Sequence, residues 1–440
     1  MGRSSLQPPA DRIQVTAGRI QETEETSNPV VDASFRRWLV LTQYFPPEIG
    51  APQIRLQAMV NVLRRRGIEV EVVTALPNYP AGKIFPAYKG KWKVREEIAG
   101  IPVRRTWVYA ATGKSAMVRL ANYFSFTFTA LISALFGPRP DVLFVESQPL
   151  SLGLVAVLMK WLRGSRYIYN VPDLQVDVAR QLGFMRNDSF LRFAFGLENF
   201  FLRNSWKVST VTHGFIDHFQ GRGLPRTQIT FLPNGADSSF LKPMPPSQEF
   251  LERWNLHGKK VFLYVGTHAF YHGLENLIDA ATLLRSRRDI AFLMIGDGPE
   301  RERLRQICAD RSLENVVFGK SPYEEMDRLY SIAFASVATL RKMEVAKGMR
   351  LSKIFPSLSC AVPVIYAGEG EAAELLREHE CGVLVPPENP ELLSQAIAAL
   401  ADNREVRDRY GRTGRALVEK EYSWNGIIGR WLVELGIVKS

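Results

Sequence analysis

The stretch Arg350–Glu374, RLSKIFPSLSCAVPVIYAGEGEAAE, decides the fold of this chain. It predicts a short helix, then a buried strand over 362–366, then a second helix that opens at 368–374. Pro356 fits the first turn of the first helix, where its missing N–H is harmless. Two helix N-termini beside Lys353 would suit an anionic ligand, since free N–H groups and the helix dipole attract negative charge. An ordinary strand between two surface helices is the alternative.

The alternation of apolar strand, polar loop and helix continues upstream of this stretch. Lys260–Val265 and Ile290–Ile295 are apolar runs that end in glycine-bearing loops, and a helix is expected after each. The first half of the chain repeats the pattern, with strands expected at 38–42, 69–74, 141–145, 167–171, 208–211 and 229–232. Strands that alternate with helices predict an α/β fold with parallel sheets. We therefore expect two Rossmann-like domains in tandem, with the active site in the cleft between them.

Four segments follow from this division. Residues 1–36 are polar and without periodicity, and we expect a disordered leader. Residues 37–238 form the first Rossmann-like domain and 239–422 the second, with the linker expected in the polar, proline-bearing stretch that follows the turn signal Pro233-Asn234-Gly235 and runs to Pro246. Residues 423–440 contain an amphipathic helix that is expected to pack back on the first domain.

The composition limits the kinds of site and partner. The formal net charge of +11 favours contact with something acidic. The three cysteines have no C-x-x-C spacing and the six histidines are scattered, so neither a metal site nor a disulfide framework is expected. A reduced, cytoplasmic compartment is the simplest inference.

Two segments of the first half suggest a membrane surface. Residues 83–107 carry seven cations against two acids, interleaved with aromatic side chains. A solvated hairpin has this pattern, and so does a patch on anionic lipid, where each cation contributes about 1 kcal/mol. The uncharged run Leu120–Phe136 is shorter than the ~20 apolar residues of a spanning helix. We expect it to pack in the domain or to lie in a membrane interface. A nucleic-acid partner could use the same basic pattern, but is not favoured.

Polar residues at strand ends are the candidates in the first half. Glu146 and Ser147 follow one expected strand and Asp173 follows the next, at the edge where ligands bind doubly wound sheets. Each acid could equally cap a helix. Gly50, after the first strand, would let the backbone approach a ligand, although a simple turn is the commoner use of such a glycine.

Several motifs taken together resemble one family. In order along the chain they are FLPNGAD, FLYVGTHAFYHGLENLIDAA, FLMIGDGPERERL and SKIF…PVIYAGEGEAAEL…CGVLVPP. This series resembles the donor half of a GT-B glycosyltransferase of family 4. YFPPEIGAPQIR, LPNYPAGKIFPAY and DVLFVESQPLSLG are similar to the branch that builds bacterial surface polysaccharides, including fucosamine and colanic-acid transferases. The resemblance covers nearly all of the chain after about residue 37.

The resemblance implies a retaining transfer of sugar from a UDP- or GDP-linked donor, without a bound metal or other cofactor. The acceptor would be a lipid-linked or growing polysaccharide on the first domain. The enzyme would be peripheral on the inner face of the cytoplasmic membrane. The roles carried over place Lys353 on the diphosphate, Gly266, Gly273 and Gly296 in the donor loops, Gly50 facing them, Glu371 on the donor sugar and Asp173 beside the acceptor with Glu146 and Ser147. Lys353 and Asp173 are the expected catalytic residues.

The sequence departs from the family pattern at four positions. Many members have two glutamates eight residues apart, where this chain has Gly348 and Pro356. Many also have an arginine and a lysine in the first donor loop, where Thr267 and His272 stand here as donor-binding candidates. These departures leave open a non-catalytic scaffold in a polysaccharide assembly complex. A nucleotide-sugar epimerase on the same fold is disfavoured, because its motifs are missing.

Overall fold

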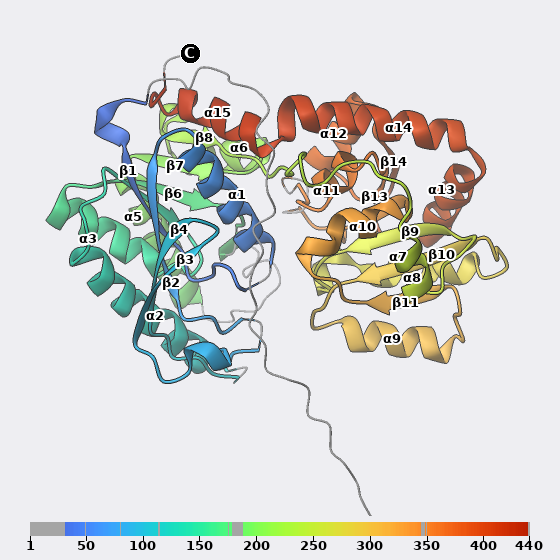
Figure 1. Cartoon of the computed structure of the whole chain (residues 1–440), viewed down its shortest axis with the longest axis horizontal. Coiled ribbons are helices and arrows are strands. Elements are labelled where there is room, and N and C mark those ends of the chain that lie inside the picture. The colour runs from blue at the N-terminus through green and yellow to red at the C-terminus, as the bar shows by residue number, and fades with distance from the viewer. Residues whose placement is uncertain are drawn as a thin grey trace, which may run out of the picture.

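The computed structural model describes residues 31–48, 50–79, 81–112, 115–174, 176–177, 188–344, 348 and 350–438. Two α/β lobes lie side by side, one for each half of the chain (Figure 1). Each lobe is a mainly parallel sheet covered by helices. The expected fold class, two Rossmann-like domains in tandem, is confirmed.

The sheet of the first lobe has eight strands in the order β3-β4-β2-β1-β5-β6-β7-β8. Neighbouring strands are parallel except for β3 and β4, which form an antiparallel hairpin at the edge. The central strands are continuous apolar runs because helices bury both faces of a parallel sheet. The bounds are β1 Arg37–Leu41, β2 Glu69–Ala75, β3 Lys93–Ile98, β4 Ile101–Thr106, β5 Val142–Glu146, β6 Arg166–Val171, β7 Lys207–Thr210 and β8 Ile229–Phe231.

The second lobe has a six-stranded, all-parallel sheet in the order β11-β10-β9-β12-β13-β14. Its bounds are β9 Lys260–Val265, β10 Ile290–Ile295, β11 Val316–Gly319, β12 Ala333–Thr339, β13 Val364–Ala367 and β14 Gly382–Val385. The strand expected at 362–366 is β13, shifted by two residues at its start.

The helices that cover the first sheet are α1 Ala51–Arg65, α2 Ala116–Leu135, α3 Leu152–Arg163, α5 Asp188–Asn204 and α6 His213–Gly221. Those of the second lobe are α7 Gln248–Arg253, α8 Leu274–Leu283, α9 Arg301–Asp310, α10 Met326–Ser331, α11 Ile354–Ser359, α12 Glu371–Glu378, α13 Pro390–Asp402 and α14 Arg404–Leu417. The last helix, α15 Trp424–Glu434, returns to the first lobe (Figure 1).

Helix α15 is held on the first lobe by buried aromatic side chains. Trp431 contacts Trp38 of β1 and Phe144 of β5 edge to face, with ring centres 5.8 and 5.9 Å apart. Such pairs add about 0.5–1.5 kcal/mol to the burial of their area. The C-terminal helix is therefore part of the core of the first lobe, although its sequence follows the second.

The chain passes between the lobes twice, and the two passages lie beside each other. The amide of Ala236 donates to the carbonyl of Tyr422 at 2.9 Å, and the amide of Trp424 donates to the carbonyl of Ala236 at 3.2 Å. Both connections between the lobes therefore cross at one place.

Two sequence predictions need correction. Residues 1–30 of the expected leader lie outside the described residues, but Val31 and Phe35 are buried, and Val31 pairs with Val438. The predicted leader 1–36 therefore extends too far, because Phe35 stacks on Trp206. The basic stretch 83–107 contributes fewer cations to the surface than expected, because Arg104 and Arg105 are buried and form ion pairs with Glu71 and Glu96.

Candidate active site between the lobes

Two loops at the carboxyl end of the second sheet pack together through glycines. Gly266 follows β9 and Gly296 follows β10, with φ angles of 147° and 142°. A Cβ atom on Gly296 would lie 1.9 Å from the carbonyl oxygen of Gly266, so any side chain there would collide. The amide of His268 donates to the carbonyl of Asp297 at 2.8 Å. The two predicted glycines thus let the loops after β9 and β10 pack directly against each other.

Lys353 reaches these loops from the start of α11, where it is the N-cap residue. Its Nζ donates to the hydroxyl of Tyr264 at 2.8 Å and lies 3.5 Å from Nε2 of His272. A Cβ atom on Gly266 would lie 3.0 Å from this Nζ, so the ammonium stands directly beside the glycine loop. Burial lowers the pKa of Lys353 to about 7. An anionic ligand would restore the charged form.

Two buried imidazoles accompany the Lys353 ammonium. Burial lowers the pKa of His268 to about 4, with smaller contributions from Arg301 and Lys353. Burial and Lys353 together lower the pKa of His272 to about 2. Both rings are therefore neutral at pH 7. Among the described residues, neither ring nitrogen of His268, nor Nδ1 of His272, has a hydrogen-bond partner. Buried polar atoms in native proteins are usually paired, so these atoms suit a polar ligand.

The remaining donor-side candidates surround this cluster. Gly273 is the N-cap of α8 and has a φ of 59°, a left-handed conformation that favours glycine. Thr267 accepts a hydrogen bond from the Tyr264 hydroxyl at 2.7 Å through its backbone carbonyl, while its residue is exposed. The structure therefore brings Gly266, Thr267, His272, Gly273, Gly296 and Lys353 to one place.

Glu371, predicted to contact the donor sugar, joins the two lobes instead of standing free. One carboxylate oxygen pairs with Arg350, and the other accepts from the amide of Gly214 at the start of α6, at 3.0 Å. Arg350 also donates to the hydroxyl of Tyr422 at 3.1 Å. Both oxygens are already engaged, so contact with a sugar would require this arrangement to open. Sequence reasoning missed Arg350.

The acceptor-side candidates fall into two kinds. Glu146 is buried and accepts from Arg55 at 2.8 Å and from Asn170 at 3.0 Å, which gives it a structural ion pair. Ser147 is buried beside it. Asp173, after β6, keeps an exposed surface and accepts from Gln148 at 3.3 Å. Desolvation by the surrounding protein raises the pKa of Asp173, and the positive charge of Arg55 opposes this shift. Asp173 is therefore the acid available to a ligand on this side.

Gly50 has a φ of 178°, an extended conformation open to any residue, and a Cβ atom there would meet the end of the Gln53 side chain. Glu48, two residues before Gly50, was not predicted as a site residue, yet it joins the loop after β1 to the loop after β2. Its carboxylate accepts from the amides of Asn78 and Tyr79, each at 2.8 Å, and burial raises its pKa to about 7. The signal available in the sequence was an acid inside the proline-rich loop YFPPEIG.

Loops from the two lobes face each other near these residues. Burial raises the pKa of Tyr271, in the second lobe, and the charge of Asp173 in the first lobe adds to it. Burial likewise raises the pKa of Tyr79, in the first lobe, and the charge of Asp297 in the second lobe adds to it. Asp173, Glu48 and Lys353 thus belong to loops that meet between the lobes.

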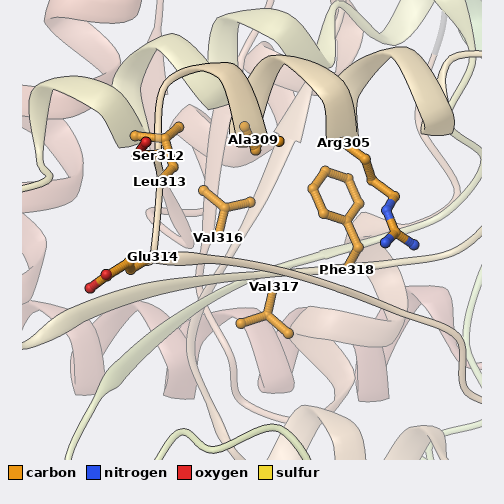
Figure 2. Close-up of a pocket in the computed structure, with 9 residues that line it drawn as sticks. Arg305, Ala309, Ser312, Leu313, Glu314, Val316, Val317 and Phe318 are labelled. Atoms are coloured by element: carbon orange, nitrogen blue, oxygen red, sulfur yellow. The ribbon is translucent and has the colours of Figure 1, made fainter.

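A separate hollow of about 550 Å³ lies between α9 and β11, as Figure 2 shows. Its lining includes Arg305, Ser312, Val316 and Phe318. It lies at the outer edge of the second sheet, where β11 is the last strand, and none of the predicted residues lines it. We therefore place the candidate site at the Lys353 cluster.

Family models match both halves of the chain. Residues 50–235 match the model "Glycosyl transferase 4-like domain", and residues 247–417 match "Glycosyl transferases group 1". The chain is 26% identical over 386 residues to the colanic acid biosynthesis glycosyl transferase WcaI of Escherichia coli (strain K12), covering 84% of this chain and 94% of the relative.

Two solved structures share the whole fold. Sucrose-phosphate synthase from Thermosynechococcus elongatus aligns with a TM-score of 0.70 at 18% identity, over 91% of this chain and 98% of its own. HepE from Anabaena, solved with UDP and glucose, aligns with a TM-score of 0.69 at 18% identity, over 91% and 99%. With both halves matched by family models, the chain belongs to the group 1 (family 4) glycosyltransferases of the GT-B fold.

Proposed function

We propose that this protein transfers a sugar from a UDP- or GDP-linked donor to a lipid-linked or growing polysaccharide acceptor, with retention of configuration at the anomeric carbon. The observation that carries the proposal is the Lys353 ammonium, which is held against the Gly266 loop beside two neutral imidazoles. The ammonium matches a diphosphate in charge, and the imidazole N–H groups can donate hydrogen bonds to its oxygens.

Lys353 would act on the leaving group. In the transfer, the bond between the anomeric carbon and a diphosphate oxygen breaks, a bond to the acceptor hydroxyl oxygen forms, and the hydroxyl proton passes to an oxygen of the leaving diphosphate. Negative charge grows on the diphosphate in this step. A cation fixed at that position in a dry pocket stabilises the transition state more than the ground state. Asp173, on the facing lobe, would bind the acceptor.

The proposed reaction needs no metal ion. Within the described parts of the chain, no group of three or more His, Cys, Asp or Glu side chains could hold a metal ion. Lys353 supplies the positive charge in our proposal. The similarity to a colanic acid biosynthesis enzyme supports a role in cell-surface polysaccharide synthesis. We propose that the protein acts as a peripheral enzyme on the inner face of the cytoplasmic membrane.

The reaction is tested by incubating the protein with a panel of UDP- and GDP-sugars, with and without a chelator. We expect one donor to stabilise the protein against heat, because a ligand that binds only the folded state raises its stability. The same donor should be slowly hydrolysed, equally well with chelator. No thermal shift and no turnover across the panel would contradict the proposed function.

The binding of a nucleoside diphosphate should weaken as the pH rises above 7. Only protonated Lys353 attracts the diphosphate, and burial has lowered its pKa to about 7 in the free protein. Above this value the affinity should fall by up to about tenfold per pH unit, until the pH reaches the higher pKa of the complex. Titration calorimetry between pH 7 and about pH 9 measures this slope. In Lys353→Met the slope should vanish, and a slope that persists would assign the proton to another group.

A non-catalytic scaffold is the second candidate. Two observations favour it: Gly348 and Pro356 stand where many relatives carry carboxylates, and both oxygens of Glu371 are engaged. A scaffold would bind nucleotide without any turnover of the donor that binds best. Detectable transfer that depends on Lys353 excludes this alternative.

A further inference from the structure

Helix α2 is apolar on the side that faces the lobe and on the side that faces solvent. Phe126, Ala130 and Ala134 are fully buried in the core of the first lobe. Phe128 and Phe136, on the opposite side, are 64% and 86% exposed. A helix that is apolar all round is normally enclosed by protein or lipid. The outer side of α2 is therefore an exposed apolar surface of the kind that protein or lipid normally covers.

The helix cannot cross a bilayer while the lobe stays folded. By length and composition alone, Met117–Leu135 could span a membrane. However, the hydroxyl of Thr129 donates to the carbonyl of Trp107, just after β4, at 2.7 Å, and Thr127 hydrogen-bonds Ser151, the N-cap residue of α3, at 2.7 Å. These bonds and the buried side tie α2 to the rest of the first lobe. Only an orientation in the plane of a membrane is compatible with this fold.

The neighbouring helices extend the exposed apolar surface. Helix α3 packs against α2, and α5 packs against α3, on the side of the first lobe away from the second (Figure 1). Trp161 of α3 and Phe193 of α5 are exposed, and the ring of Trp161 contacts Phe200 of α5 at 6.2 Å. We define the α2–α3–α5 face by Phe124, Phe128, Ile132, Phe136, Trp161 and Phe193.

The charge on these helices is positive. Arg119, Lys160, Arg192 and Arg203 are exposed. Among the described side chains of α2, α3 and α5, the one carboxylate is Glu198, which is buried and paired with Arg222 at 2.6 Å. An apolar surface bordered by cations matches the interface of a bilayer with anionic headgroups.

We propose that the α2–α3–α5 face docks on an anionic lipid bilayer, with α2 lying in the interface. Strand β4 of the edge hairpin packs against α2, so the hairpin extends the same surface. Its partner strand β3 carries the exposed Lys93 and Arg95 against one exposed acid, Glu97, and the exposed Trp92 stands just before it. Binding to the bilayer does not depend on the proposed function. Only the benefit of docking, which is access to a lipid-linked substrate, rests on that function. Asn122 of α2 accepts from Gln43, just after β1, at 2.6 Å. Docking would thus hold the acceptor-side loops close to a lipid-linked substrate.

The test is co-sedimentation of the full chain with vesicles of phosphatidylcholine, alone or mixed with phosphatidylglycerol. We expect binding to the mixed vesicles that weakens with salt, because screening reduces the attraction of cations to the surface. The double variant Phe124→Ser/Phe128→Ser should bind at least about tenfold more weakly, since two aromatic side chains no longer enter the interface. The matched control is Leu283→Ser/Leu392→Ser, which removes two exposed apolar side chains of the second lobe and should bind like the wild type.

Three outcomes decide the proposal. Wild-type protein that stays in the supernatant with mixed vesicles would overturn it, and so would a Phe124/Phe128 variant that binds undiminished. Self-association through this face, seen as a dimer that the double variant abolishes while lipid binding is absent, would assign the surface to a second copy instead. Donor hydrolysis without vesicles is measured in parallel. Vesicle binding without nucleotide binding would support docking while contradicting the proposed function.

Discussion

Replacing Lys353 by methionine is expected to lower kcat for sugar transfer by about 10²- to 10³-fold, the usual effect of removing one group that stabilises charge in the transition state. Methionine keeps most of the length and volume of the side chain but cannot carry charge. The effect should appear mainly in kcat, because the interaction strengthens as the diphosphate leaves. Initial rates with the donor identified in the panel provide the measurement.

Folding controls separate this loss from a damaged structure. Burial opposes the charged form of Lys353, so its pKa is lower in the folded protein than in the unfolded chain. A group of this kind destabilises the folded state at pH values below its unfolded pKa, and most strongly below its folded pKa. Lys353→Met should therefore unfold at the same temperature as the wild type or higher. The control Lys242→Met, at an exposed lysine of the linker, should keep full activity. Full activity in Lys353→Met would contradict the mechanism.

Replacing Arg350 by methionine is expected to destabilise the protein by about 3–5 kcal/mol, the cost of leaving a buried charge without its partner. The side chains of Arg350 and Glu371 are only 4% and 12% exposed. Loss of Arg350 would leave the Glu371 carboxylate with the Gly214 amide as its remaining contact among those described here. Urea unfolding followed by tryptophan fluorescence measures the change.

A second substitution tests the cause. In Arg350→Met/Glu371→Gln the carboxylate is gone, and we expect much of the lost stability to return. Arg287→Met is the matched control, because Arg287 forms ion pairs with Asp289 and Asp402 at the surface, where such pairs contribute about 0–1 kcal/mol. If the double variant is as unstable as Arg350→Met, packing of the guanidinium on Tyr422 would account for the loss.

The strands of the second lobe were predictable because their signal is local. β9 and β10 have the bounds expected from their apolar runs, since glycine loops end both. The two-domain fold followed from the alternation of strands and helices. In contrast, the edge strand β14 was not predicted, although it has four residues like the predicted β13.

The candidate site was predictable only in part, because its contacts are distant in the sequence. Lys353 and Tyr264 are 89 residues apart and Arg55 and Glu146 are 91 apart, so spacing could not reveal either pair. The helix starts around Lys353 indicated an anion site, and the resemblance to a family then assigned roles to Lys353 and the glycines. An acid at the end of a strand gives the same sequence pattern whether it binds a ligand or pairs with an arginine. Glu146 was therefore predicted as an acceptor-side residue although it pairs with Arg55. The uncharged run of α2 could not show which side the lobe would cover.

The most direct test of the account is a crystal structure of the protein with UDP or GDP bound. We predict that the diphosphate lies between the lobes, within hydrogen-bond distance of Lys353 Nζ and of amides in the loops that begin at Gly266 and Gly296. A nucleotide bound in the hollow between α9 and β11, or a divalent ion bridging the phosphate oxygens at the Lys353 cluster, would contradict it.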